Sequence, residues 1–212
     1  NTTPPFLKLP RPEQKAAAEA AGKVEREAKA WVEVVAAAAD YADPAAADAA
    51  ARKPVREVLF DDAFPDGSSS RSSSRNAVDW TVAPGFRPAS GRRVIRQGCN
   101  DSVTFGALRP VVVPHDGAFE IWLRADPLDV PASVSFGVAG KGTVSWNRTE
   151  KGLVHQGSKD PPVVPGQWAK LAVPAADLGL KPGDRVTGLT LSQSGGIAYW
   201  DAAALVGEAD PK

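Results

Sequence analysis

Three tryptophans of this chain lie two residues before a cationic side chain. The pairs are Trp122 with Arg124, Trp146 with Arg148, and Trp168 with Lys170. A flat aromatic ring packs against the C–H face of a pyranose, while planar polar groups beside it exchange hydrogen bonds with hydroxyls. The combination therefore suits sugar binding. Tryptophan also packs in the cores of β-sandwiches, so packing is the alternative for each ring.

The strongest candidates for ligand binding are Trp146, Asn147 and Arg148, because they follow a Gly-rich turn, 140–142, at which a ligand could approach the backbone. On a strand, Val144 and Trp146 share one face. If that face is the core, both side chains are buried. If the strand lies on the concave sheet, the same face forms the floor of a groove, with Arg148 supplying donors to sugar hydroxyls or acidic groups.

Three aspartates form a second candidate site. Asp61 and Asp62 follow the first expected strand and Asp201 lies in the last one, and such strands are often neighbours in a sandwich. Carboxylates and carbonyls bind Ca²⁺, so a structural calcium is one prediction, and no other cofactor is expected in this chain. In the alternative, Asp61 and Asp62 cap a turn after Phe60 while Asp201 accepts hydrogen bonds from nearby amides.

Catalytic residues are scarce. His115, expected in a turn, and His155, expected in a loop, are the only histidines. Neither has a nucleophile or further metal ligands at a persuasive spacing. A carboxylate pair for glycoside hydrolysis is assembled in space rather than in sequence, and Glu120 and Glu150 would be the first to test. We therefore expect a chain that is not an enzyme.

The composition limits the classes of partner that the protein is expected to bind. The 25 basic residues balance the 25 acidic ones, so no global field favours nucleic acid. Cys99 is the single cysteine, which excludes an internal disulfide. No apolar run approaches the length of a membrane span. Because the chain contains no Met and begins at Asn1, we interpret it as a piece of a larger protein.

The first 53 residues predict a helical arm. Residues 12–42 are rich in Ala, Glu and Lys, and their apolar side chains recur at steps of three and four. The stripe consists of Val24, Ala28, Trp31 and Val35. A second, short helix is expected over 44–52. The arm packs on the sandwich or on the parent protein, or it forms a dimeric coiled coil.

Residues 54–212 predict a mainly β domain, an antiparallel jelly-roll sandwich, because the apolar pattern changes to period two with Gly and Pro between the segments. A Ser-rich run, 67–75, is too polar to bury anything and is expected to be a mobile loop. The expected strands are 55–60, 78–82, 92–97, 103–113, 118–124, 133–138, 143–148, 167–173, 186–193 and 197–206.

Several short motifs, in this order, resemble a helix and β module found in the planctomycete cytochrome-c-type multidomain proteins. The first part is the stretch Asn1-Thr-Thr-Pro-Pro-Phe-Leu-Lys-Leu-Pro-Arg-Pro-Glu-Gln14 followed by the Ala-rich helix. The motifs of the β module are Leu59-Phe-Asp-Asp-Ala-Phe-Pro65, Trp80, Ser90-Gly91, Trp146-Asn-Arg148, Gly166-Gln-Trp168, Leu171-Ala-Val-Pro-Ala175, Gly179-Leu-Lys-Pro-Gly183 and Tyr199-Trp-Asp201. The resemblance implies a galactose-binding-like β-sandwich inserted in an extracytoplasmic protein, periplasmic or secreted. The haem-attachment motif of those proteins is absent here, so no haem chemistry is carried over.

Together these observations predict a non-catalytic, carbohydrate-binding-like module of a larger secreted protein of the planctomycete type. Its expected partners are a polysaccharide and the flanking domains of the parent protein, with no nucleic acid and no membrane span. The alternative is a purely structural or docking insertion with no ligand of its own.

Overall fold

The computed structural model describes most of the chain, as two compact units, Asn1–Ala50 and Ala51–Lys212. The sequence placed this boundary three residues later, after residue 53. At positions 37, 38 and 107–109 only the backbone is described. The described ranges are 12–38, 51–64, 68–73, 78–82, 85–98, 100–156 and 160–210.

The first unit contains the helix α1, Pro12–Ala38. Proline suits its first position, because the N–H that proline lacks would have no partner there. Along the helix, Lys29 pairs with Glu25 at 2.8 Å, a favourable four-residue spacing. The apolar stripe is uncovered within this unit, since Trp31 is 68% exposed. The continuation predicted beyond residue 38, and nearly all of the second short helix, lie outside the described residues.

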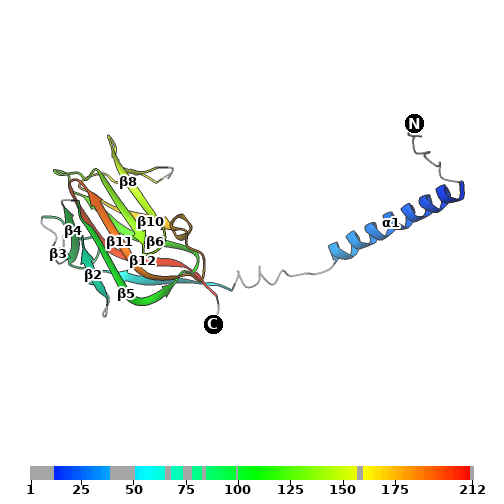
Figure 1. The fold of residues 1–212 in the computed structure, drawn as a ribbon, viewed down its shortest axis with the longest axis horizontal. Coiled ribbons are helices and arrows are strands. Elements are labelled where there is room, and N and C mark those ends of the chain that lie inside the picture. Colours follow the sequence, from blue (N-terminus) through cyan, green and yellow to red (C-terminus); the bar gives the residue numbers. More distant parts are fainter. Residues whose placement is uncertain are drawn as a thin grey trace, which may run out of the picture. The chain divides into compact units, whose positions relative to one another are not determined.

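The second unit is an antiparallel β-sandwich of the jelly-roll type that the sequence predicts (Figure 1). One sheet has the order β10-β6-β12-β4-β3, with β1 also paired to β12. Its strands are β1 (Lys53–Phe60), β3 (Asp79–Val82), β4 (Arg93–Gly98), β6 (His115–Ala125), β10 (Trp168–Pro174) and β12 (Ile197–Ala209).

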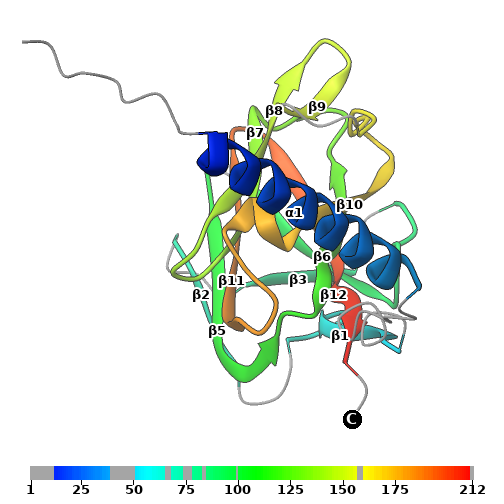
Figure 2. The same cartoon turned by 90° about the vertical axis from the view of Figure 1, so that its right-hand side faces the viewer.

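The other sheet has the order β2-β5-β11-β7-β8-β9, and its β8–β9 hairpin extends beyond the neighbouring strands (Figure 2). Its strands are β2 (Ser69–Ser72), β5 (Ser102–Val112), β7 (Ser133–Val138), β8 (Thr143–Thr149), β9 (Gly152–His155) and β11 (Arg185–Ser194). A short 3₁₀ turn, η1 (Ala175–Leu178), follows β10 of the first sheet.

Alternation along the strands builds the core between the two sheets. On β6, Phe119, Ile121 and Leu123 are fully buried, while the residues between them face outwards. Phe119 meets Phe136 of β7 in the opposite sheet, with ring centroids 5.3 Å apart. Burying such rings and branched side chains from both inner faces is the main source of the sandwich's stability.

A polar link crosses this core. Trp200 Nε1 donates to Gln97 Oε1 at 2.6 Å, and Gln97 Nε2 donates to the Leu191 carbonyl of the other sheet at 3.0 Å. Gln193 is also buried, at 5% exposed, but neither its amide nitrogen nor its amide oxygen has a hydrogen-bond partner. The core thus contains one satisfied and one unsatisfied glutamine.

All ten predicted strands are present. The structure has two further strands, β2 and β9, in segments where the sequence predicted loops, and the turn predicted at His115 is also wrong. The Ser-rich run contains β2, which pairs with β5 in the register Ser72 with Val103. His155 lies in β9 rather than in a loop, and His115 begins β6 rather than lying in a turn. Ladder hydrogen bonds join backbone groups, so polar segments can form strands without an apolar signature.

Candidate functional site

A cleft of about 470 Å³ lies at one edge of the sandwich, between β8 and β9 of one sheet and β10 and η1 of the other. It is therefore assembled from both sheets. Among the described strands, β10 pairs with β6 alone, so it forms an edge of its sheet there. Its lining residues are Val144, Trp146, His155, Gln156, Asp160, Ala172, Val173, Pro174 and Asp177. A hollow of this volume falls in the range of small-ligand sites.

The aromatic part of the wall is formed by Trp146 and His155, which are paired across β8 and β9. Their ring centroids lie 5.6 Å apart with an interplanar angle of 49°. Trp146 is 4% exposed and Val144 5%, so the core alternative for this strand face is confirmed. Trp146 consequently offers the cleft little of its ring, and the more exposed ring is that of His155.

The imidazole of His155 has a defined hydrogen-bond arrangement. Its Nδ1 lies 2.9 Å from the Ser145 carbonyl oxygen. A carbonyl can only accept, so Nδ1 carries the hydrogen and Nε2 is the nitrogen left for other partners. In the neutral ring, Nε2 is an acceptor.

Among the described residues that line the cleft, the two charged side chains are acidic. Asp177 stands in η1, just after the edge strand β10, and Asp160 precedes the segment that bridges to β9 through Val163 and Leu153. Among the described lining residues there is no Lys or Arg. The cleft therefore offers carboxylate oxygens, the Gln156 amide and an imidazole nitrogen beside an apolar floor.

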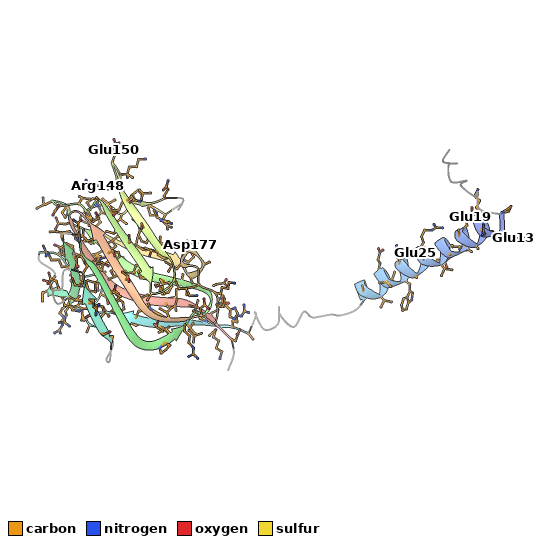
Figure 3. The ribbon with its side chains drawn as sticks, in the orientation of Figure 1. Glu13, Glu19, Glu25, Arg148, Glu150 and Asp177 are labelled. Carbon is orange, nitrogen blue, oxygen red and sulfur yellow. The ribbon has the colours of Figure 1, made fainter. Side chains whose placement is uncertain are left out.

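The other residues predicted around Trp146 do not join it in the cleft. Arg148 donates from its guanidinium to the Val130 carbonyl oxygen at 2.9 Å, and Asn147 is exposed on the opposite face of β8. In Figure 3, Arg148 and Glu150 lie towards the outer end of the β8–β9 hairpin, well apart from Asp177. Arg148 is not among the described residues that line the cleft, so its predicted role as a hydrogen-bond donor to a ligand stays a prediction.

Trp122 and Arg124 face outwards from β6, on the first sheet, and form no common site with Trp146. The Arg124 guanidinium lies over the Phe86 ring, 4.3 Å from its centroid. Trp168 donates from Nε1 to the Arg87 carbonyl at 2.8 Å. Arg124 and Trp168 are therefore held by contacts with Phe86 and Arg87, in the loop before β4.

Glu120 and Glu150 do not form a catalytic pair, because Glu120 is on the outer face of the first sheet and Glu150 is in the turn between β8 and β9 of the second. Glu120 accepts from Lys170 Nζ at 2.6 Å and is also bonded to Arg56. Burial raises its pKa, but the hydrogen bonds from these two cations prevail and hold it below the ordinary value.

The three predicted aspartates gather around one loop, so their proximity is confirmed. Ser90 donates from its backbone N–H to Asp201 Oδ2 at 2.9 Å and from its hydroxyl to Asp61 Oδ2 at 3.1 Å. Asp62 Oδ1 accepts from the N–H groups of Arg92 and Arg93, at 2.6 and 2.7 Å. The acceptance of nearby amide N–H groups by Asp201 agrees with the alternative of the sequence analysis. Asp61 and Asp62 do not cap a turn after Phe60 as that alternative expected, because their carboxylates bind the loop at residues 90–93.

Asp201 is fully buried, and burial raises its pKa above the ordinary value, with the Asp61 carboxylate adding to the effect. Both carboxylate oxygens of Asp201 accept hydrogen bonds from backbone N–H groups, those of Ser90 and Ala202. Asp61 Oδ1, in contrast, is buried without a hydrogen-bond partner. Within the described ranges, no group of three His, Cys, Asp or Glu is arranged to hold a metal. Calcium here stays a prediction, which an unchanged Tm between millimolar Ca²⁺ and chelator would remove.

Two expectations concern the whole chain. In the part of the chain that the structure describes, no helix is both long and apolar enough to cross a membrane. Cys99 lies outside the described residues.

No family model matches the chain, and no curated protein matches it in sequence. Several solved structures are similar in fold. The K3 cleaved adhesin domain of Lys-gingipain from Porphyromonas gingivalis is 12% identical with a TM-score of 0.43, over 72% of this chain and 98% of that one. A family 11 carbohydrate-binding module from Clostridium thermocellum, in complex with a β-1,3-1,4-mixed-linked tetrasaccharide, is 10% identical with a TM-score of 0.39, over 74% and 98%.

The module TmCBM61, in complex with β-1,4-galactotriose, is 12% identical with a TM-score of 0.38, over 66% of this chain and 88% of that one. The likeness concerns the fold alone and says nothing of a ligand for this chain.

Proposed function

We propose that this chain is a non-catalytic, carbohydrate-binding-like module and that the cleft at the sandwich edge is its binding site. The observation that carries the proposal is the composition of that cleft. It combines an apolar floor, the ring of His155 and hydrogen-bond acceptors on Asp177 and Gln156 in one hollow of about 470 Å³. A sugar presents the complement, C–H faces and a rim of hydroxyl donors.

Binding of this kind is weak. The cleft is open and part of the ligand stays hydrated, while the ordering of a flexible glycan opposes association. Weak binding is sufficient for a module that is tethered to other domains, because tethering raises their local concentration at a polysaccharide surface. We propose accordingly that the parent is a larger extracytoplasmic protein of the planctomycete type, whose flanking domains act on or near the polysaccharide.

A variant that fills the cleft without disturbing the core tests this function. Ala172 is exposed on β10 and lines the cleft, so Ala172→Trp should block it. The matched control is Ala132→Trp, which adds the same side chain at an exposed position outside the cleft. We expect the chain to be retarded in affinity gels that contain soluble glycans. The retardation should disappear in Ala172→Trp and remain in the control variant.

Retardation that survives Ala172→Trp would place binding elsewhere on the sandwich. Absence of retardation on any neutral, basic or acidic glycan would contradict the proposed function altogether. Circular dichroism spectra of both variants should match that of the parent chain, which would show that the substitutions leave the fold intact.

The exposed stripe of α1 favours a second role, that of a docking element within the parent protein. Val24 is 64% exposed and Trp31 68%, and large apolar side chains in a row are a mark of interaction surfaces. If the stripe docks on a flanking domain, trypsin should cleave at Lys23 and Lys29 rapidly in this chain and slowly in the longer parent. Equal rates would contradict docking.

A further inference from the structure

We propose that the outer face of the second sheet is a further binding surface, fitted to the flat surface of an insoluble neutral polysaccharide. This inference goes beyond the proposed function, because the surface is separate from the cleft. On β8 the cleft is lined by Val144 and Trp146, which point into the sandwich. The carrying observation is a set of hydroxyl side chains that pair across neighbouring strands. This hydroxyl face is defined by Ser102, Thr104, Ser135, Ser145, Thr190 and Ser192.

Strand register places these residues in parallel rows. One row crosses β8, β7, β11 and β5 as direct register partners, in the order Ser145, Ser135, Ser192 and Ser102. The row beside it crosses the same strands, in the order Thr143, Gly137, Thr190 and Thr104. A third row, on β8, β7 and β11, consists of Asn147, Ser133 and Ser194. Asn147, which the sequence singled out for ligand binding, therefore lies at a corner of this face.

The face is flat and uncharged because of the residues that the pleat turns outwards. Thr190 and Ser192 alternate along β11 with Leu189 and Leu191, whose side chains are fully buried in the core. No side chain in the three rows is larger than that of asparagine, and none is charged. A charged ligand therefore gains nothing from these rows, whereas a flat neutral one can approach them closely.

The hydroxyl pairs suit a ligand that is itself rich in hydroxyls. The oxygens of Ser102 and Ser192 lie 2.9 Å apart, and so do those of Ser135 and Ser145. Each hydroxyl has one donor and two acceptor lone pairs, so a pair bonded to itself still offers both kinds of group to a ligand. The hydroxyls of a neutral polysaccharide present the same two kinds. Because the pairs already restrain short side chains, ordering them on binding costs little.

The size of the face argues against a protein as its occupant. With strands about 4.8 Å apart and alternate residues about 6.7 Å apart, three rows on four strands cover roughly 400 Å². A stable protein–protein interface buries about 800 Å² on each partner, and its centre is depleted in serine. A second copy of the chain would therefore be held too weakly. A solid polysaccharide presents a repeating flat surface, on which a small contact is sufficient for a tethered module.

The test measures co-sedimentation of the chain with microcrystalline cellulose. Ser192→Lys places an ammonium group in the middle of the hydroxyl face, and we expect it to weaken binding at least about tenfold, because the contact would bury an unpaired charge. Ser135→Lys, at the neighbouring position of the same row, should cause the same loss. The matched control is Ala63→Lys, which adds the same side chain at an exposed position just after β1. This control and the cleft variant Ala172→Trp should bind as the parent chain does.

Salt distinguishes the hydroxyls from a charge at the margin of the face, where Arg71 of β2 pairs with Thr104. Binding through uncharged hydroxyls should be nearly the same at about 0.05 M and about 0.5 M NaCl, since salt screens only charges. A steep loss of binding with added salt would overturn the inference.

Sedimentation of Ser192→Lys equal to that of the parent chain, an equal loss in Ala63→Lys, or no sedimentation of the parent chain would each overturn the inference. Loss of sedimentation in Ala172→Trp would do the same, because it would assign the binding to the cleft. A dimer in analytical ultracentrifugation that Ser192→Lys dissociates would make a second copy the occupant of the face. The proposed function is tested separately, since retardation by soluble glycans should depend on the cleft and not on Ser192.

Discussion

Replacing Trp146 by Ala distinguishes a tryptophan that supports the cleft from one that serves as its binding platform. The indole is 4% exposed and belongs to the core between the sheets. Truncating a buried Trp to Ala usually costs about 3–5 kcal/mol, because the transfer free energy is lost and a cavity remains. Here the cavity would adjoin the cleft and water could enter it, so the lower end, about 3 kcal/mol, is expected.

The assay is urea unfolding followed by near-ultraviolet circular dichroism. With a slope of about 2 kcal/mol/M, a loss of about 3 kcal/mol moves the midpoint down by about 1.5 M. Trp122→Ala serves as the comparison, because Trp122 is only partly buried on the outer face of β6. It should shift the midpoint by about a third as much, in line with typical partly buried substitutions.

A midpoint that moves by less than about 0.3 M in Trp146→Ala, below roughly 0.6 kcal/mol, would refute the assignment of this ring to the core. If glycan binding also disappeared in that variant, Trp146 would be a ligand platform. A large shift together with lost binding agrees with the structure, because the ring contact with His155 holds β9 at the cleft wall.

Three further outcomes are expected from urea unfolding. Gln193→Leu should stabilise the chain by about 1 kcal/mol, since it removes buried amide atoms that lack partners; a destabilised variant would mean that the amide has a partner such as a water. The pKa of Glu120 is lower in the folded state than in the unfolded state. Its ionised carboxylate therefore stabilises the fold at pH values above the unfolded-state pKa, and this stabilisation is lost as the pH falls through the folded-state pKa. Glu120→Gln should therefore cost about 1 kcal/mol at pH 7 and nothing near pH 2, and an equal loss at both would contradict the ion pairs. Removing residues 1–50 should leave the midpoint of the sandwich unchanged, because the units are separately compact; a large shift would show that they stabilise each other.

The strands were predictable from sequence wherever burial alternates. On β6 and β7 the side chains that face the core are large and apolar, and the period-two pattern locates both strands. The strand β2 has only serine and arginine, and β9 has four residues, so neither carries that pattern. Each is held by backbone hydrogen bonds to a neighbouring strand, β2 to β5 and β9 to β8, and this pairing leaves no pattern in the sequence.

The cleft could be predicted only in part, since its walls come from segments far apart in the chain. Trp146 was singled out by residue type and by the Gly-rich turn before it. The sequence predicts a loop at His155, and nothing in the local sequence connects Asp177 with either residue. Their meeting depends on how the two sheets close at this edge, which is a consequence of packing rather than of any motif.

The outer face of the first sheet suits the proposed binding less well than the edge does, because its groups are already in contact with one another. On the first sheet, the loop before β4 packs Phe86 against Tyr199, with ring centroids 4.9 Å apart, and against Trp168. Beyond that loop, the surface is held by the ion pairs of Glu120 with Arg56 and Lys170. A sugar there would have to displace contacts that already satisfy these groups. At the edge, the carboxylate of Asp177 has no such ion pair among the described residues, and a ligand can gain its hydrogen bonds without breaking others.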